Sequence, residues 1–196
     1  DPEISGRKAG KRTSERLNPK KAKSAKVPVV YDPRVSNGIV RHVTSAINGV
    51  SIARGTSFLK ECMGKQLFPK GVSIIDDPHR LRGLSSKPFD AEGLANNPIS
   101  FIEDGMLTQW VLDLRSARQL GLTSNGRASR GTSSPPGPST TNLHMTPGAL
   151  SPEALIGEIE SGLYITDMMG FGVNGVTGDY SRGASGFWIE AGELAY

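Results

Sequence analysis

Three histidines and one cysteine are the side chains in this sequence that most often bind metals or act as nucleophiles. His42, His79 and His144 lie far apart, and none belongs to a short ligand pair such as H-E-x-x-H. Cys62 has no histidine near it in sequence, and a single cysteine excludes both an intramolecular disulfide framework and a multi-cysteine zinc module. We therefore predict no metal site in this chain and a packed, neutral thiol at Cys62.

Two glycine-containing segments partly match known sequence motifs. Gly170-Phe-Gly-Val-Asn-Gly175 matches the dinucleotide pattern G-x-G-x-x-G. That pattern binds phosphates only where a helix follows, and residues 176–183 are poor helix sequence with two more glycines. Gly183-Ala-Ser-Gly186 places its second glycine one residue too early for a G-x-S-x-G nucleophile elbow. Neither segment predicts a nucleotide site or a serine nucleophile.

The polar residues of this glycine-rich stretch are better candidates for ligand binding. They are Asp179, Tyr180, Ser181, Arg182 and Gly183. Glycine lets a backbone approach a ligand strand closely, and an arginine such as Arg182 is suited to hold a peptide carbonyl or carboxylate. The structural alternative is a buried pair between Asp179 and Arg182 that merely fixes the loop.

Strands and turns dominate the elements that must position these residues. Apolar segments predict strands at residues 27–31, 71–76, 99–103, 163–168 and 187–190. Asp104-Gly105 predicts a tight hairpin into residues 106–112, and Ala191-Gly192 predicts a final hairpin into Glu193–Tyr196. The 24 glycines and 13 prolines agree with many turns. We expect an α+β fold, a β-rich domain of mainly antiparallel sheet with a few short helices.

One amphipathic helix is predicted clearly. Asp32-Pro33 supplies an N-cap and a first-turn proline, and the pattern ends at Asn48-Gly49. Apolar residues recur at helical spacing between them: Val35, Ile39, Val43 and Ile47. We expect this helix to pack against a sheet, with His42 at the edge of its apolar stripe. Shorter helices are predicted at residues 9–17, at 116–120 and from Ser151 to Gly162.

A long loop rich in glycine, serine and proline is predicted at Asn125–Thr141. Loops of this length inside a compact domain are usually working loops or mobile ones. Whether this loop gates a groove stays open at the level of sequence.

Positive charge is concentrated at the start of the chain. Of the net charge of +4, residues 1–26 contribute +6, from nine basic and three acidic side chains, and the other 170 residues carry −2. We therefore predict that residues 1–26 form a solvated basic linker arm, with a nucleic-acid-binding arm as the alternative. Residues 27–196 are predicted to form one domain. No apolar run reaches the roughly 18 residues of a membrane helix, and no secretory signal is visible. We expect a cytoplasmic protein without membrane or general nucleic-acid association.

The whole Gly170–Glu190 segment closely resembles the C-terminal signature of PmbA (also called TldE) proteins, in the TldD/PmbA family. Further blocks resemble that family in the same order: Ser57–Leu59, Gly64–Pro69, Pro98–Gly105, Ser116–Gly121 and Ser139–Leu143. The resemblance implies a C-terminal domain of this family, as a fragment that lacks an N-terminal domain and the extreme C-terminus.

The resemblance also locates a metal motif that this chain does not keep. It implies that the TldD-type subunit carries H-E-x-x-x-H on the helix after Asp32. Here His42 matches the first histidine, Val43 stands at the glutamate and Ile47 at the second histidine. Because zinc needs N, S or O donors and its water needs a base, the chain agrees with the TldE-type pattern. Zinc is then expected in the partner subunit and no metal cofactor in this chain.

The implied function is that of a non-catalytic, peptide-handling subunit of a TldD/TldE-type zinc metallopeptidase acting on unfolded peptides. Its partner would be a TldD-like catalytic subunit, with a homodimer as the alternative. Two other functions stay open. One is a modulator associated with DNA gyrase or nucleic acid, suggested by the basic arm and an older family name. The other is an independent hydrolase using the loop from Asp179 to Arg182, for which no base is identifiable.

Overall fold

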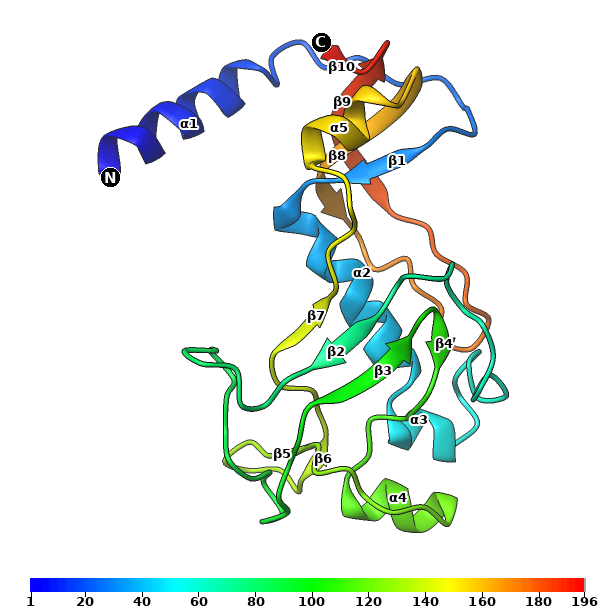
Figure 1. Ribbon diagram of the computed structural model, residues 1–196. Coiled ribbons are helices and arrows are strands. Elements are labelled where there is room, and N and C mark those ends of the chain that lie inside the picture. Colours follow the sequence, from blue (N-terminus) through cyan, green and yellow to red (C-terminus); the bar gives the residue numbers. More distant parts are fainter. Residues whose placement is uncertain (196) are drawn as a thin grey trace.

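The computed structural model describes residues 1–195, which form two four-stranded sheets joined by a helix (Figure 1). The terminal sheet has the order β1-β8-β9-β10, with β1 Val29–Tyr31, β8 Ser161–Met169, β9 Gly183–Glu190 and β10 Glu193–Ala195. The central sheet has the order β4-β3-β2-β7, with β2 Ile74–Asp76, β3 Ile99–Glu103, β4 Met106–Leu107 and β7 Leu143–Met145. A small ribbon pairs β5 Ala128–Ser129 with β6 Gly137–Pro138.

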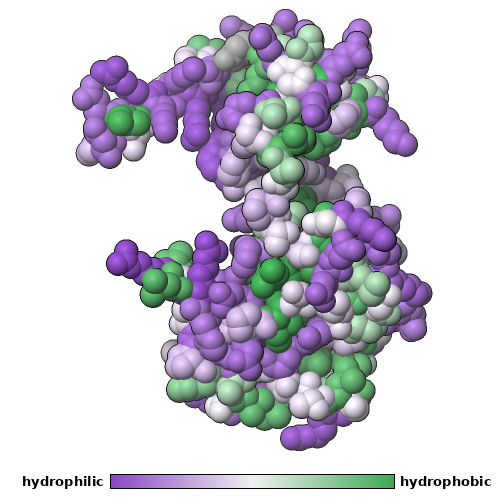
Figure 2. Space-filling view, in the orientation of Figure 1, coloured by the Kyte–Doolittle hydropathy of each residue, from purple (hydrophilic) through white to green (hydrophobic). Residues whose placement is uncertain are grey.

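The helices are few and mostly short: α1 Pro2–Ser14, α2 Pro33–Ala46, α3 Gly49–Ala53, α4 Leu114–Leu120 and α5 Pro152–Gly157. α2 runs from the terminal sheet to the central sheet, and α1 extends away from the body (Figure 1). In space-filling view the molecule narrows between its two ends (Figure 2). Among residues 1–195, no helix has the length and apolar character needed to cross a membrane.

The predicted fold class is confirmed. Strand pairs within the three sheets are antiparallel except β1 and β8, which run parallel with Val29 opposite Leu163. Both predicted hairpin turns form. Asp104 and Gly105 have φ of 48° and 82°, and Ala191 and Gly192 have φ of 50° and 80°, as a tight two-residue turn requires. Tyr196, predicted at the end of the last strand, lies outside the described residues.

Helix α2 forms where the sequence predicts it. The Asp32 side chain caps it by accepting a hydrogen bond from the Arg34 backbone N–H at 2.9 Å, and Pro33 occupies its first turn. It ends at Ala46 because Asn48 begins a new helix, accepting the N–H of Val50 at 3.0 Å. The chain therefore bends at this point, and α3 packs against α4 and β6.

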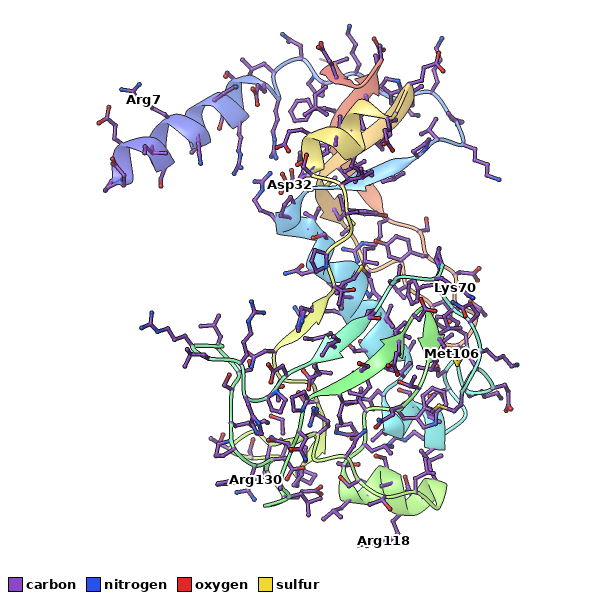
Figure 3. The ribbon with its side chains drawn as sticks, viewed as in Figure 1. Arg7, Asp32, Lys70, Met106, Arg118 and Arg130 are labelled. Carbon is purple, nitrogen blue, oxygen red and sulfur yellow. The ribbon has the colours of Figure 1, made fainter. Side chains whose placement is uncertain are left out.

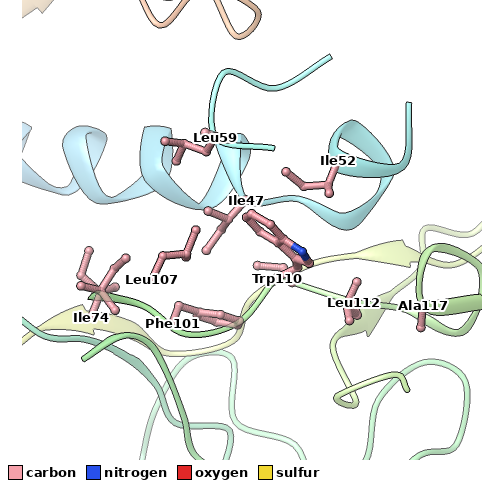
Figure 4. Close-up of a cluster of buried hydrophobic side chains, with 12 residues drawn as sticks. Ile47, Ile52, Leu59, Ile74, Phe101, Leu107, Trp110, Leu112 and Ala117 are labelled. Atoms are coloured by element: carbon pink, nitrogen blue, oxygen red, sulfur yellow. The ribbon is translucent and has the colours of Figure 1, made fainter. Parts of the chain in front are cut away.

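The hydrophobic core lies between α2, α3 and the central sheet (Figure 4). Ile47 at the end of α2 and Ile74, Phe101 and Leu107 from the central sheet have no exposed surface. Each such side chain stabilises the fold by about 1.5–3 kcal/mol relative to exposure. Cys62 packs half-buried against this cluster, as expected.

Several element boundaries differ from the prediction. The first helix covers Pro2–Ser14 instead of 9–17, because Asp1 caps it and Pro2 begins it. The helix expected from Ser151 to Gly162 ends at Gly157, because β8 takes residues from Ser161 onward for pairing with β9. β9 begins at Gly183, since the small residues 183–186 pair with the end of β8 instead of forming a loop.

The loop Asn125–Thr141 is anchored to the central sheet by a fully buried arginine. Arg127 Nε donates to Asp76 Oδ2 at 2.5 Å, and its Nη2 donates to the Asn97 carbonyl at 2.5 Å. The same Asp76 carboxylate accepts the backbone N–H of Thr141 at 2.7 Å. Both ends of the loop are thus tied to one carboxylate at the end of β2.

Substitution of Arg127 should therefore lower the free energy of unfolding. Arg127→Ala leaves the buried Asp76 carboxylate without its cation, and we expect the free energy of unfolding to fall by about 3–5 kcal/mol. Urea denaturation followed by circular dichroism measures this. Arg130→Ala, an exposed arginine of the same loop (Figure 3), is the matched control and should change stability by less than about 0.5 kcal/mol. Equal effects of the two substitutions would show that the buried pair does not anchor the loop.

Candidate functional site

His42, on α2, lies against Tyr180 of the glycine-rich segment. Their ring centroids are 5.6 Å apart and the planes meet at 64°, an edge-to-face contact. The Tyr180 hydroxyl donates to Met168 Sδ at 3.3 Å. Met168 in turn lies close to α2, because a Cβ at Gly38 would be 3.5 Å from its Cε. α2, the end of β8 and the segment after it therefore meet at one place.

Arg182 joins this group from the same segment. Its Nε donates to the carbonyl of Met169 at 3.2 Å, which fixes the guanidinium near the end of β8. The positive charge of Arg182 acts on the His42 imidazole. We call His42, Met168, Tyr180 and Arg182 the His42 cluster.

Residues 170–182 are folded tightly on themselves. The Ser181 N–H donates to the Gly172 carbonyl at 2.7 Å, and the Asn174 N–H donates to the Asp179 carbonyl at 2.9 Å. A Cβ at Gly172 would overlap the carbonyl of Ser181. Glycine is required there by close backbone approach, and the segment holds its side chains in set directions.

The same segment is also fixed to the chain that follows α3. The Phe58 N–H donates to the Gly175 carbonyl at 3.0 Å. The Phe58 ring lies beside Gly178, where a Cβ would come within 2.9 Å of it and where φ is +83°. Gly178 therefore serves both the turn and the packing of this ring.

The structure separates the residues that were proposed together from sequence. Tyr180 contacts His42 and Arg182 bonds to the nearby Met169 carbonyl, whereas the exposed Asp179 carboxylate accepts the Thr177 hydroxyl at 2.6 Å. Ser181 is exposed, and Gly183 opens β9 opposite Met169. The alternative of a buried Asp179–Arg182 pair is wrong for the part of the chain that the structure describes, because Asp179 is exposed and the two side chains do not pair.

The electrostatic environment of His42 is cationic. Burial lowers the pKa of its imidazole, and the charges of Arg182 and Arg41 lower that pKa further. Because the shift is downward from 6.5, His42 is mainly neutral at pH 7. The site at neutral pH therefore consists of a neutral imidazole with two guanidinium groups acting on it.

The α2 positions that correspond to the H-E-x-x-x-H motif do not offer a metal site. Ile47 is fully buried in the core, and Val43 packs against the same core. His79 bonds to Asn96, and His144 lies on β7, so neither joins His42. In residues 1–195 no group of three or more His, Cys, Asp or Glu side chains is placed to hold a metal ion. The donor set around His42 does not fit zinc.

A buried carboxylate, Asp32, holds the start of α2 against the terminal sheet through a partner that no local sequence pattern indicates. The Tyr164 hydroxyl on β8 donates to Asp32 Oδ2 at 2.9 Å, and Arg34 Nε donates to Oδ1 at 2.9 Å. Burial raises the pKa of Asp32, but these hydrogen bonds outweigh it and lower the pKa to about 2. The N-cap was predictable from Asp32-Pro33, whereas Tyr164 comes from a strand far along the chain.

The basic arm also touches the terminal sheet. Arg16 pairs with Asp167 on β8, and the basic residues Lys8, Lys11 and Arg12 line a recess with Leu194 of β10. Residues 8–16 of the arm are therefore in contact with the terminal sheet, and Arg16 reaches β8 next to Met168.

Comparison with known proteins places this chain and its fold in a family. The model of the PmbA/TldA metallopeptidase C-terminal domain matches residues 24–196, beginning within the predicted arm. The metalloprotease PmbA of Escherichia coli O157:H7 is 42% identical over 195 residues, covering 100% of this chain and 41% of that protein. The chain thus spans about two fifths of the curated relative's length.

Solved structures of other proteins have the same fold as this chain. A Thermotoga maritima protein described as a proposed modulator of a DNA gyrase has a TM-score of 0.89 and 31% identity, over 100% of this chain and 45% of that one. TldE from Thermococcus kodakarensis has a TM-score of 0.76 at 24% identity, over 88% and 40%, and supports the fold alone. This α+β domain is therefore of the type found in the C-terminal part of a metallopeptidase family. The chain belongs to the PmbA/TldD family.

The close approach at Gly172 yields a direct test of the site's construction. Gly172→Ala should push the Ser181 carbonyl away, cost about 1–3 kcal/mol of stability and separate Tyr180 from His42. The separation is measured as loss of the ring-current shift on the His42 imidazole protons in NMR. Gly175→Ala is the matched control, because the nearest atom to its Cβ is 4.0 Å away. An unchanged His42 signal in Gly172→Ala would contradict the described packing.

Proposed function

We propose that this chain belongs to a non-catalytic, peptide-handling subunit of a TldD/TldE-type zinc metallopeptidase. One observation carries the non-catalytic part of the proposal. The two α2 positions that would supply a base and a second zinc ligand are Val43 and Ile47, and Ile47 has 0% exposure in the core. Valine cannot accept a proton from water, and a buried isoleucine has no donor atom for zinc.

Family membership supports the peptidase part of the proposal. Relatives of this chain carry the name metalloprotease PmbA. A complex in which hydrolysis occurs must then obtain its zinc-bound water and carboxylate base from a sister subunit of the TldD type. Unfolded peptides are the proposed substrate of that complex.

The fold offers a plain way to hold such substrates. In the described residues the edge strands are β1 and β10 of the terminal sheet and β4 and β7 of the central sheet. The outer side of β4 already hydrogen-bonds to residues 64–67, which leaves β1, β10 and β7 as candidate edges. An extended peptide pairs with an edge strand through main-chain hydrogen bonds, so it binds with little dependence on its side chains. The His42 cluster adds a place where a charged group of the peptide is held.

A second candidate function follows from the description of the Thermotoga maritima protein as a gyrase modulator. The observation that would favour it here is the basic arm of residues 1–26, with a net charge of +6. The rest of the chain carries −2, so electrostatic attraction to DNA is confined to the arm. Salt-dependent DNA binding that persists after deletion of residues 1–26 would support this candidate over the peptidase subunit.

Peptide cleavage by the full-length protein tests the proposal. We expect no cleavage of an unfolded peptide by the protein alone, and metal-dependent cleavage when a TldD-type sister subunit is added. Arg182→Ala should lower turnover by about 10–100-fold, the effect of losing a charge-assisted hydrogen bond, while the two subunits still co-purify. Arg118→Ala, on the exposed face of α4 (Figure 3), is the control and should have no effect.

Two outcomes would contradict the proposal. Cleavage by the protein alone in the presence of a chelator would instead indicate an independent hydrolase that uses the segment from Asp179 to Arg182. Full activity of the sister subunit without this protein would remove the peptide-handling role.

A further inference from the structure

The His42 cluster holds positive charge that nothing in the described chain neutralises. Arg182 uses its Nε on the Met169 carbonyl and forms no ion pair within residues 1–195. Arg41, one residue before His42 on α2, is exposed and likewise has no carboxylate partner in that range. Both charges lower the pKa of the His42 imidazole, but the Arg41 side chain lines a separate recess with Asn48 and Pro138, so Arg182 is the cation that lies in the cluster itself.

Nearby carboxylates are committed to other groups. The Asp179 carboxylate, in the same segment as Arg182, accepts the Thr177 hydroxyl. Asp167, on β8 before Met168, pairs with Arg16 of the basic arm. Asp32 at the start of α2 is held by Arg34 and Tyr164. Asp179 keeps its charge, but none of these three carboxylates forms an ion pair with Arg182, so its guanidinium can accept an anion from outside.

We propose that the His42 cluster binds the C-terminal carboxylate of a peptide, with Arg182 as the principal contact and Arg41 as the second positive charge. This inference rests on the proposed peptide-handling function and adds to it the end of the peptide that is recognised. A peptide bound in this way has its terminal carboxylate at the end of β8, beside α2.

Arg182 is suited to this role by its geometry. Its Nε–H is held by the Met169 carbonyl, so the planar guanidinium is oriented before a ligand arrives. The remaining guanidinium N–H groups can donate two parallel hydrogen bonds to one carboxylate. Tyr180 and Met168, which contact each other, provide an apolar wall beside this position for the last side chain of the peptide.

The charge of the site also selects the direction of the peptide. An N-terminal ammonium group would be repelled by the positive charge of Arg182, whereas a carboxylate is attracted. A side-chain carboxylate or a phosphate shares the same charge chemistry, so the test must separate these sources from a peptide terminus.

Binding of short peptides to the full-length protein provides the test. The probes are one N-acetylated hexapeptide with a free C-terminal carboxylate, the same peptide with a C-terminal amide, and the amide with a central glutamate. Isothermal titration calorimetry at low salt gives each Kd. We expect the peptide with a free carboxylate to bind at least about 10-fold more tightly than the amide, because only the carboxylate can form charge-assisted hydrogen bonds with Arg182.

Variants assign that preference to the cluster. Arg182→Gln should reduce the ratio of the two Kd values to near one, and Arg41→Gln should reduce it partly. Arg182→Lys keeps the charge without the paired donors and should give an intermediate ratio, and circular dichroism confirms that each variant is folded. Arg118→Gln, on α4, should keep the full ratio.

Three results would overturn the inference. They are equal binding of carboxylate and amide peptides, a preference that survives Arg182→Gln, and binding of the central-glutamate amide as tight as that of the free carboxylate. Competition by millimolar inorganic phosphate that abolishes the difference between the two peptides would likewise indicate a general anion site.

A carboxylate preference without zinc-dependent turnover alongside a sister subunit would support this site and reject the proposed function. Zinc-dependent peptide turnover without a preference for the free carboxylate would support the proposed function and reject this site.

Discussion

The packing of α2 onto the central sheet is the constraint on which the rest of this structure depends. Ile47 and Ala46 at its end are buried with the side chains of β2, β3 and β4, and Val43 packs against them one turn earlier. A helix buried along one face has a fixed rotation, so His42, next to Val43, must face the segment that follows β8. Asp32 and Tyr164 hold the other end of the helix, and the rotation is therefore set at both ends.

This rotation also decides the chemistry available at the site. A zinc site at the motif positions would need polar side chains at Val43 and Ile47, which instead pack in the core. Replacing Ile47 with a metal ligand would bury a polar group in an apolar cluster. The packing that stabilises the domain therefore also places apolar side chains at the positions that the motif would need for zinc ligands. What remains at the surface of the helix is an imidazole whose pKa is lowered by burial and by the charges of Arg182 and Arg41, the site at which we propose that an anion binds.

Local features of the fold could be predicted from sequence, and long-range ones could not. Asp32-Pro33, Asp104-Gly105 and Ala191-Gly192 act through backbone geometry within a few residues, so α2 and both hairpins were predictable. Arg127 looked like an ordinary loop arginine, because its partner Asp76 lies on a distant strand and no local pattern links them. The contact between His42 and Tyr180 is likewise long-range. The family resemblance had pointed to both residues separately, and only the fold brings them together.

Zinc content of the assembled pair tests the central claim most directly. The full-length protein would be mixed with a TldD-type sister subunit, the complex isolated, and zinc measured by elemental analysis against the amount of each chain. The account predicts one zinc per pair, unchanged by His42→Ala in this protein and lost when the motif histidines of the sister are replaced. Two zinc ions per pair, with one lost on His42→Ala, would contradict it.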